Sequence, residues 1–427
     1  MDSKFFKIGD IFNVEKGLVQ SSKNVEGQFD FITASAEWKT HNEYSHDCEA
    51  LVFAAGAAGS LGRTHYVNGK FIASDLCFVL TPKDNLIDKV DLKFYFYYFN
   101  LNKDTIVKST ATGTSKLAIN MKNFINYCIP LPSIEYQKLG RERIEEVEPK
   151  INELDLIFEK NLTYITRLRQ SILQEAVQGK LVPQDPNDEP ASVLLEKIKE
   201  EKERLIKEGK IKKEKPLPPI TEDESPYELP KGWEWVRLGE ICSLITDGTH
   251  STPNYVSHGV PFLSVKDVSN GFIDFNDTKF ITQQEHEELI KRCKPEYGDV
   301  LLTKVGTTGI AKVIDTKREF SIFVSLALLK IINNTLNPYY IEYMLNSPLG
   351  KKQSEENTQG IGNKNLVIKC IKSFIVPLPP LNEQKRIVEK VDQLMALCDE
   401  LEKNIEQSKK DSELLMQSVL QEAFKGA

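Results

Sequence analysis

Apolar residues recur at steps of three and four in two long, highly charged segments, residues 134–178 and 381–427. A repeat of 3.5 residues places these positions along one side of an α-helix, which is the pattern of a coiled coil. In chain order the periodic positions are Ile144, Val147, Ile151, Leu154, Phe158, Ile165, Leu168, Ile172, Val391, Leu394, Cys398, Leu401, Ile405, Ser412, Leu415 and Val419.

The two helical segments repeat each other. SILQEAVQGK at 171–180 returns as SVLQEAFKGA at 418–427, and IPLPSIEYQK at 129–138 returns as VPLPPLNEQK at 376–385, both at an offset of 247 residues. Such self-similarity indicates a repeated structural unit. One apolar stripe cannot bury itself, so we expect the two helices to pair in antiparallel orientation.

Three polar or cyclic residues interrupt this pattern. Pro149 lies inside the first helical segment and lacks an amide hydrogen, so it predicts a kink or a restart of the helix. Asn161 and Ser408 occupy matched positions on the apolar stripe, where they could fix the register of the pair.

A region of shorter periodicity precedes each helix. Runs such as EALVFAA (49–55) and SIFVSLALLKI (321–331) are separated by Gly and Asn turns and predict strands, with aromatic helices at 91–100 and 338–347. FFKIGDIF pairs with WVRLGEIC, which begins at Trp235, at an offset of only 230. The globules therefore vary in length while the helices do not.

These patterns predict an α+β fold in which two similar globules are separated by two long antiparallel coiled-coil helices with internal pseudo-twofold symmetry. The expected boundaries are a first globule at 1–133, a first long spacer helix at 134–178, a linker with a short charged helix at 179–230, a second globule at 231–380 and a second long spacer helix at 381–427.

Composition is typical of a soluble protein, and nearly all of the net negative charge lies outside the two globules. The net charge is −7, yet residues 1–133 carry 14 basic and 14 acidic side chains and residues 231–380 carry 17 and 16. Neutral globules can hold a local basic face, so the total charge does not exclude nucleic acid. The chain shows no apolar run long enough to span a membrane and no leader pattern, so we expect a cytoplasmic protein.

No catalytic or cofactor motif stands out. GAAGSLG (56–62) and VGTTGIAK (305–312) follow strands but lack the P-loop pattern, and NPYY (337–340) lacks a proline of the adenine methyltransferase motif. The seven cysteines form no CxxC pair, and His41 and His46 lack the HExxH spacing. We expect no catalytic, cofactor-binding or metal site on this chain.

Polar loops at equivalent places in the two globules are the candidates for ligand contact. They recur in position but differ in side chains, as expected of two domains that recognise two different DNA sequences. Ordinary turns and solvated loops remain the alternative interpretation. The candidate DNA-binding residues are Arg63, Thr64, Thr112, Gly113, Thr114, Ser115, Lys116, Thr246, Asp247, Gly248, Thr249, His250, Lys304, Gly306, Thr307, Thr308, Gln359, Asn363 and Lys364.

Three segments resemble the specificity subunit of Type I restriction–modification enzymes. LPKGWEWVRLGEI opens a globule, PLPPLNEQKRIVEKVDQL opens a long helix, and SILQEAVQGKLVPQ closes one. The first globule departs from the pattern because it begins with MDSKFFKIGDIF.

The resemblance implies a non-catalytic subunit with two target-recognition domains that read a bipartite target in double-stranded DNA. It also implies docking of two methyltransferase subunits, which would bind S-adenosylmethionine, and of restriction motor-nuclease subunits, which would use ATP and Mg²⁺. A recognition module or coiled-coil adaptor for an unrelated DNA-modifying enzyme is the alternative. A free-standing methyltransferase or nuclease would need a cofactor loop or an acidic cluster.

Overall fold

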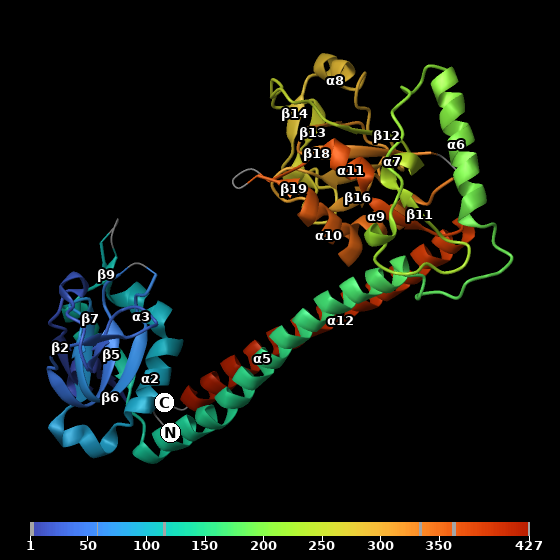
Figure 1. The fold of residues 1–427 in the computed structure, drawn as a ribbon. Helices are drawn as coiled ribbons and strands as arrows, with labels where there is room; N and C mark the ends of the chain where they lie inside the picture. Colours follow the sequence, from blue (N-terminus) through green and yellow to red (C-terminus); the bar gives the residue numbers. More distant parts are fainter. Residues whose placement is uncertain (1–3, 58, 114–116, 333–334, 361–363, 426–427) are drawn as a thin grey trace. The chain divides into compact units, whose positions relative to one another are not determined.

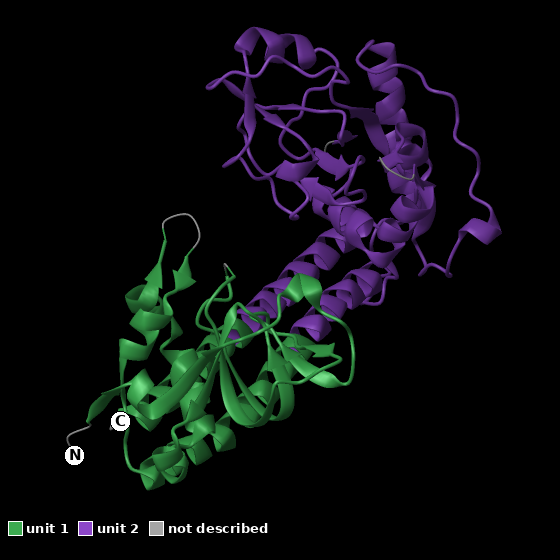
Figure 2. Cartoon of the chain, turned by 90° about the vertical axis from the view of Figure 1, so that its left-hand side faces the viewer, with its two compact units in different colours: residues 1–160, 405–427 green, residues 161–404 purple. Residues whose placement is uncertain are grey.

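The computed structural model describes residues 4–57, 59–113, 117–332, 335–360 and 364–425. They form two compact units, residues 1–160 with 405–427 and residues 161–404 (Figure 2). Each unit combines one globule with a part of both long helices.

The first globule alternates strands with short helices (Figure 1). Its elements are β1 (Phe5–Lys7), α1 (Ile8–Ile11), β2 (Phe12–Lys16), β3 (Phe29–Ile32), β4 (Lys39–His41), β5 (His46–Ala54), β6 (Thr64–Ala73), β7 (Cys77–Pro82), α2 (Leu92–Leu101), α3 (Lys103–Thr110), β8 (Ala111–Thr112), β9 (Ala118–Ile119), α4 (Met121–Asn126) and β10 (Cys128–Pro130).

The second globule follows a linker that contains one helix, α6 (Ala191–Lys207). Its elements are β11 (Glu234–Arg237), α7 (Leu238–Ile241), β12 (Cys242–Asp247), β13 (Val260–Leu263), β14 (Lys279–Ile281), α8 (Gln283–Leu289), β15 (Val300–Thr303), β16 (Ala311–Val313), β17 (Ser321–Ile322), β18 (Leu326–Ile331), α9 (Pro338–Asn346), α10 (Pro348–Asn357), β19 (Thr358–Gln359), β20 (Asn365–Leu366), α11 (Ile368–Ser373) and β21 (Ile375–Leu378).

Both globules have the same strand order. The first has a six-stranded sheet, β2-β7-β5-β6-β3-β4, and the second divides this order between β12-β18-β15-β16 and β14-β13-β17. The strands β16 and β17 together stand in the place of β6. Among the named strands, β3 pairs with β6 in parallel in the first globule, and β13 pairs with β17 in parallel in the second. The sequence repeat therefore produces two copies of one fold.

A matched amide contact attaches a helix to a strand in each copy. Asn100 at α2 donates to the carbonyl of Thr64 at 3.0 Å and accepts from its amide at 3.1 Å. Asn346 at α9 makes the same two bonds with Ala311, at 2.9 and 3.0 Å. These bonds satisfy the backbone groups where β6 and β16 begin, so the following strand is held at the same place in both copies.

A second matched contact joins each globule to its long helix. The Gln137 side chain accepts from the amide of Asp91 at 2.8 Å, and Gln384 accepts from the amide of Asn337 at 2.9 Å. Both glutamines are fully buried. The aromatic helices α2 and α9 are thereby fixed to the start of the long helices.

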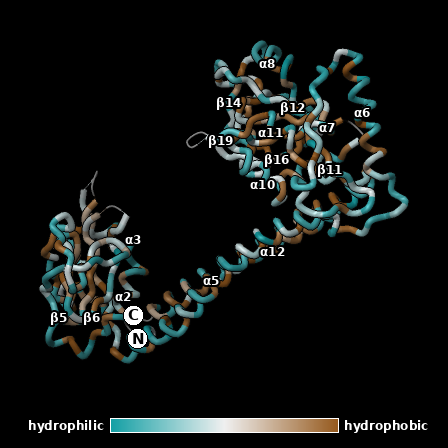
Figure 3. The backbone as a smooth tube through the Cα atoms, viewed as in Figure 1, coloured by the Kyte–Doolittle hydropathy of each residue, from teal (hydrophilic) through white to brown (hydrophobic). Residues whose placement is uncertain are grey.

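Hydrophobic residues are frequent along the strands of each globule (Figure 3), and their buried side chains supply the core. In the first globule, Phe53 and Leu51 on β5 pack with Phe99 on α2 and Phe124 on α4, and all four are fully buried. The alternate β5 residues, such as Val52, pack on the opposite face of the sheet. Because both faces of β5 are buried, apolar residues follow one another along this strand without alternating with polar ones.

The two long helices, α5 (Ile134–Val177) and α12 (Leu381–Phe424), each contain 44 residues and pack together. Lys409 pairs with Glu159 at 2.7 Å in one unit, and Arg169 pairs with Asp399 at 2.6 Å in the other. The partners' numbers fall on one helix as they rise on the other, so the pairing is antiparallel as predicted. No described helix is apolar enough over a sufficient length to cross a membrane.

Pro149 does not restart the first helix, contrary to one of the two outcomes that we expected. The helix α5 continues through it from Ile134 to Val177. Proline removes one backbone hydrogen bond, and packing of the flanking turns compensates for this loss. Ile144 and Ile151, on either side of Pro149, are both buried.

Four of the predicted stripe positions are exposed. Leu154 and its repeat equivalent Leu401 are 41% and 49% exposed, and Leu168 and Leu415 are 45% and 54% exposed. Two paired helices bury only a narrow stripe, so residues at its edge stay uncovered. Ser408 is also exposed, and it therefore does not fix the register from inside the seam.

Candidate nucleic-acid interface

Three loops meet at one end of the sheet in the second globule. The Val324 amide donates to the Thr249 carbonyl at 2.9 Å, which joins the turn before β18 to the loop after β12. The Lys304 amide donates to Ser325 at 2.9 Å, and the Lys304 carbonyl accepts from Leu366 on β20 at 2.7 Å. The candidate segments 246–250 and 304–308 are thus brought together with the β19–β20 region, whose Lys364 carbonyl accepts from the Gly306 amide at 3.0 Å.

The same backbone bonds form at the same place in the first globule. The Asp75 amide donates to Val19 at 2.9 Å, the Ala55 amide donates to Leu76 at 2.8 Å, and the Ala55 carbonyl accepts from Ile119 at 2.8 Å. The turn after β5 and the β8–β9 hairpin, which hold the candidates of this globule, therefore meet a third loop, the one after β2.

This third loop of the first globule was missed by the sequence reasoning. Gly17 and Gly248 are equivalent, because a Cβ at either position would lie about 2 Å from a carbonyl oxygen, 2.1 Å from Ser74 or 2.0 Å from Ile322. Gly17 and Gly248 are 231 residues apart, so the offset of 230 between FFKIGDIF and WVRLGEIC would have placed this loop to within one residue. The irregularity in β12 between Cys242 and Leu244 accounts for the extra residue. The exposed polar residues of the loop after β2 are Gln20, Ser21, Ser22 and Lys23, and the exposed Lys16 ends the strand before it.

The turns after β5 and β15 each pack closely on a helix of the same globule through a glycine. Gly62 and Gly309 have φ of 80° and 84°, and a Cβ would lie 2.9 Å from the Lys103 side chain on α3 or 2.7 Å from the Ser354 side chain on α10. Each of these two glycines therefore lets its turn pack closely on a helix of the same globule. This packing fixes the turns and presents the residues between the glycines.

Asp247 is the centre of a charged network in the second globule. Its carboxylate accepts from Lys304 at 3.3 Å and from Arg292 at 2.6 Å, with His250 at 3.4 Å. Lys304 is only 4% exposed and also donates to the Val324 carbonyl at 3.3 Å. Asp247 and Lys304 thus hold the loops, whereas the side chains of Arg292 and His250 reach solvent.

Arg63 and Thr64 have structural contacts in the first globule. Arg63 is half-buried and donates to the Ala34 carbonyl at 3.1 Å and to Ser60 at 3.4 Å. Thr64 is buried, and its hydroxyl donates to the Gly62 carbonyl at 3.3 Å. The residues structurally equivalent to Arg63 and Lys304 are Ile310 and Ala55, so these two cations are not counterparts.

The other candidates vary in exposure. Gly248 is buried, and Thr246, Thr249 and Thr308 are half-buried; Thr308 lies 3.2 Å from the hydroxyl of Thr358. The exposed candidates are Thr112, Gly113, His250, Gly306, Thr307, Gln359 and Lys364. Thr114, Ser115, Lys116 and Asn363 lie outside the described residues.

The exposed set offers hydroxyl, amide and cationic donors, which are the groups that contact phosphates and base edges. Arg292 is a candidate that the sequence reasoning missed, because it lies 45 residues from Asp247. Within the residues that the structure describes, no group of three or more His, Cys, Asp or Glu side chains could hold a metal ion.

Comparison with known families gives one match that covers most of the chain. The family model for the Type I restriction modification DNA specificity domain matches residues 1–159 and 230–408. The chain is 34% identical over 288 residues to the Type I restriction enzyme EcoAI specificity subunit of Escherichia coli. That match covers 66% of this chain and 48% of the relative, so it spans about half of the relative's length.

A more distant relative matches over a greater share of its length. The Type I restriction enzyme EcoKI specificity subunit of Escherichia coli (strain K12) is 24% identical, with 96% of this chain and 82% of the relative covered.

Two solved structures share the fold. A chain from work on complex assembly and conformational transition of the type I R-M system has a TM-score of 0.70 at 20% identity, with 99% of this chain and 98% of the other covered. The HsdS subunit from Thermoanaerobacter tengcongensis has a TM-score of 0.57 at 20% identity, with 99% and 96% covered.

Proposed function

Because the chain belongs to the Type I restriction modification DNA specificity family, we propose that it selects the DNA target of a restriction–modification enzyme and catalyses no reaction itself. The relatives that carry this description are specificity subunits of Type I restriction enzymes. A protein with this role acts in the cytoplasm, where the DNA is.

Each globule reads one half of a bipartite target in double-stranded DNA. The observation that carries this proposal is that equivalent loops meet at the same end of both sheets but differ in side chains. The recognition domains are residues 1–133 and 231–380, the spacer helices are 134–178 and 381–427, and the linker is 179–230. The same position with different donors would give different base preferences.

The contact residues that we propose are the exposed ones. Within the first globule they lie at the end of β2, on the loop after it and on the β8–β9 hairpin, with Lys16, Lys23 and Thr112 as the leading members. Within the second they are Arg292, His250, Thr307, Gln359 and Lys364. Arg63, Thr64, Asp247 and Lys304 position these loops through the contacts given above.

Two methyltransferase subunits dock on the paired helices. The exposed leucines support this, because Leu154 and Leu401 occupy one repeat position and Leu168 and Leu415 another. Apolar side chains that are exposed at equivalent positions of a repeat indicate two equivalent contact surfaces. These partners would bind S-adenosylmethionine, and motor-nuclease subunits with ATP and Mg²⁺ would join them for restriction.

Mapping of methylated adenine in cells that express this chain tests the proposal. The cells would carry the chain together with its cognate methyltransferase subunit, and control cells would carry the methyltransferase subunit alone. We expect methylation at one bipartite motif only when both proteins are present. Methylation that does not depend on this chain, or that follows a continuous motif, would disprove the proposal.

A further inference from the structure

The linker after the first long helix covers a defined surface of the second globule. Arg237 on β11 donates to the carbonyls of Pro218 and Pro219, each at 3.2 Å, and pairs with Glu224 at 2.7 Å. The Tyr227 ring packs on Trp235 with centroids 5.1 Å apart. The occupant of this surface is therefore a proline-containing segment that leads into an acidic 3-10 turn, Glu222–Glu224.

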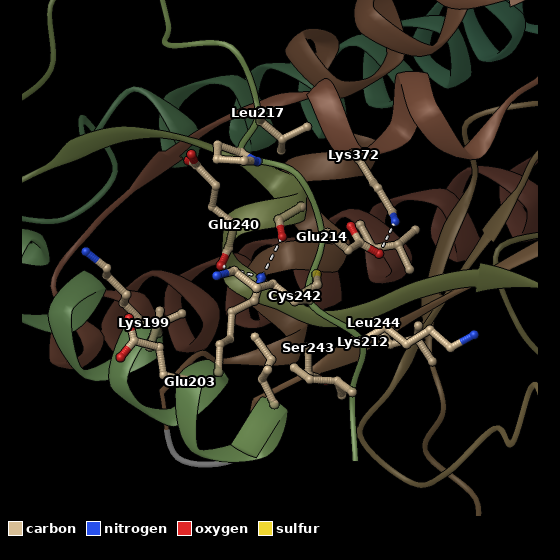
Figure 4. Close-up of a pocket in the computed structure, with 18 of the residues that line it drawn as sticks. Lys199, Glu203, Lys212, Glu214, Leu217, Glu240, Cys242, Ser243, Leu244 and Lys372 are labelled. Carbon is tan, nitrogen blue, oxygen red and sulfur yellow. Dashed lines mark hydrogen bonds and ion pairs between the residues drawn. The ribbon is translucent and has the colours of Figure 1, made fainter. Parts of the chain in front are cut away.

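Further contacts fix the same segment next to α7. Figure 4 shows Glu214 of the linker and Lys372 of α11 joined by an ion pair of 2.6 Å. Leu217 lies against Gly239, where an added Cβ would be 3.0 Å from its methyl group. Between this segment and α6 remains a cleft of about 470 Å³.

The charge of Glu224 contributes to this docking. Its pKa is lowered to about 2, first by the hydrogen bond from Arg237 and then by the backbone amide of Thr221. The segment therefore presents a carboxylate that is ionised at neutral pH to the basic residue of the strand.

The first globule has an equivalent surface, and none of the residues that the structure describes covers it as the linker covers the second. At the offset of 230, Phe5 stands for Trp235, Lys7 for Arg237 and Gly9 for Gly239. Phe5 is 62% exposed and Lys7 is exposed. Neither an ion pair of Lys7 nor a ring contact of Phe5 is found among the described residues.

We propose that this surface, Phe5, Lys7 and Gly9, binds an acidic, proline-containing segment of a partner protein. The aromatic, basic and small residues that hold the linker on the second globule are all retained in kind. Proline-containing segments dock on aromatic surfaces with little loss of conformational freedom, because they are already extended. In the second globule, the linker segment is what the corresponding aromatic, basic and glycine residues bind.

The partner is a different polypeptide rather than a second copy of this chain. The linker of a second copy is already held by its own Arg237 and Trp235, and its release would break those contacts. The surface also lies before β2, whereas the proposed DNA-contacting loop follows β2. A bound segment would therefore leave that loop free, and this inference stands apart from the proposed function.

A synthetic peptide that copies residues 212–228 of the linker provides the probe. Its binding to the protein of residues 1–427 would be measured by fluorescence anisotropy. We expect saturable binding that falls at least tenfold in F5A and in K7E. Because Glu224 meets the basic residue, a peptide with E224K should bind the K7E protein at least tenfold better than the original peptide does.

The matched controls are I87A and K39E, which remove an exposed apolar group or reverse an exposed charge elsewhere on the first globule. Both should bind like the unchanged protein. Absence of binding at millimolar peptide, or binding that both F5A and K7E retain, would overturn the inference. So would self-association of the protein that F5A abolishes, because that result would identify a second copy as the occupant.

Discussion

At the residue scale, the network around Asp247 separates positioning residues from contact residues. Lys304 is buried against Asp247 and the Val324 carbonyl, whereas Arg292 shares the same carboxylate and reaches solvent. A cation that is only partly neutralised and exposed can still attract phosphate, but a buried ammonium cannot approach it. Lys304 thus holds the loop in place, and Arg292 supplies its exposed positive charge.

Replacement of Arg292 by alanine should weaken DNA binding without a change of target sequence. Loss of one phosphate contact lowers the slope of log affinity against log salt by about one. The measurement is the affinity of the assembled complex over a salt series. K291A is the control, because it removes one charge from the adjacent residue, which pairs with Glu288. Equal slopes for R292A and the unchanged protein would contradict the assignment.

Replacement of Lys304 by methionine should act mainly on stability. The change leaves the buried Val324 carbonyl without this donor and removes one cation from Asp247, at a cost of roughly 1–3 kcal/mol. Urea unfolding would measure it. A stable K304M protein with a reduced salt slope would instead make Lys304 a direct phosphate contact.

At the element scale, the glycine turns depend on close packing against α3 and α10. G309A should destabilise the protein more than G306A, because both have positive φ but only Gly309 lies against a helix. The positive φ alone costs about 1–2 kcal/mol, and the crowding at Ser354 adds roughly 1–3 kcal/mol. Denaturant unfolding of the two variants compares them directly, and equal losses would contradict this account.

The exposed leucines on the long helices make a second prediction at this scale. L154S with L415S should reduce binding of a methyltransferase subunit while the chain remains folded, because these side chains are already exposed. The expected stoichiometry falls from two partner subunits to one, which native mass spectrometry would show. L168S with L401S should have the same effect, and I87A should have none. Retention of two subunits in both double variants would exclude this docking surface.

At the scale of the whole molecule, the repeat made most of the fold predictable. Offsets of 230 and 247 identify two copies, and a 3.5-residue pattern predicts the paired helices. The exposure of Leu154 and Leu401 was not predictable, because the pattern does not tell how wide the buried stripe is.

The candidate site was predictable by position but not by residue. The loops were found because they recur, yet the burial of Lys304 depends on Asp247, which is 57 residues away in sequence. The same holds for Arg292, whose partner becomes a neighbour only when α8 and β12 fold together. Long-range pairings of this kind leave no local signal in the sequence.

The central claim is that each globule reads one half of the DNA target, and a change confined to one globule tests it most directly. Thr307 and Gln359 would be replaced by alanine together, and the methylated motif would be mapped in cells that also express the methyltransferase subunit. We predict that one half of the motif relaxes, by roughly 1–3 kcal/mol for each lost base contact, while the other half stays unchanged. An altered motif in both halves, or an unchanged motif in both, would contradict the account.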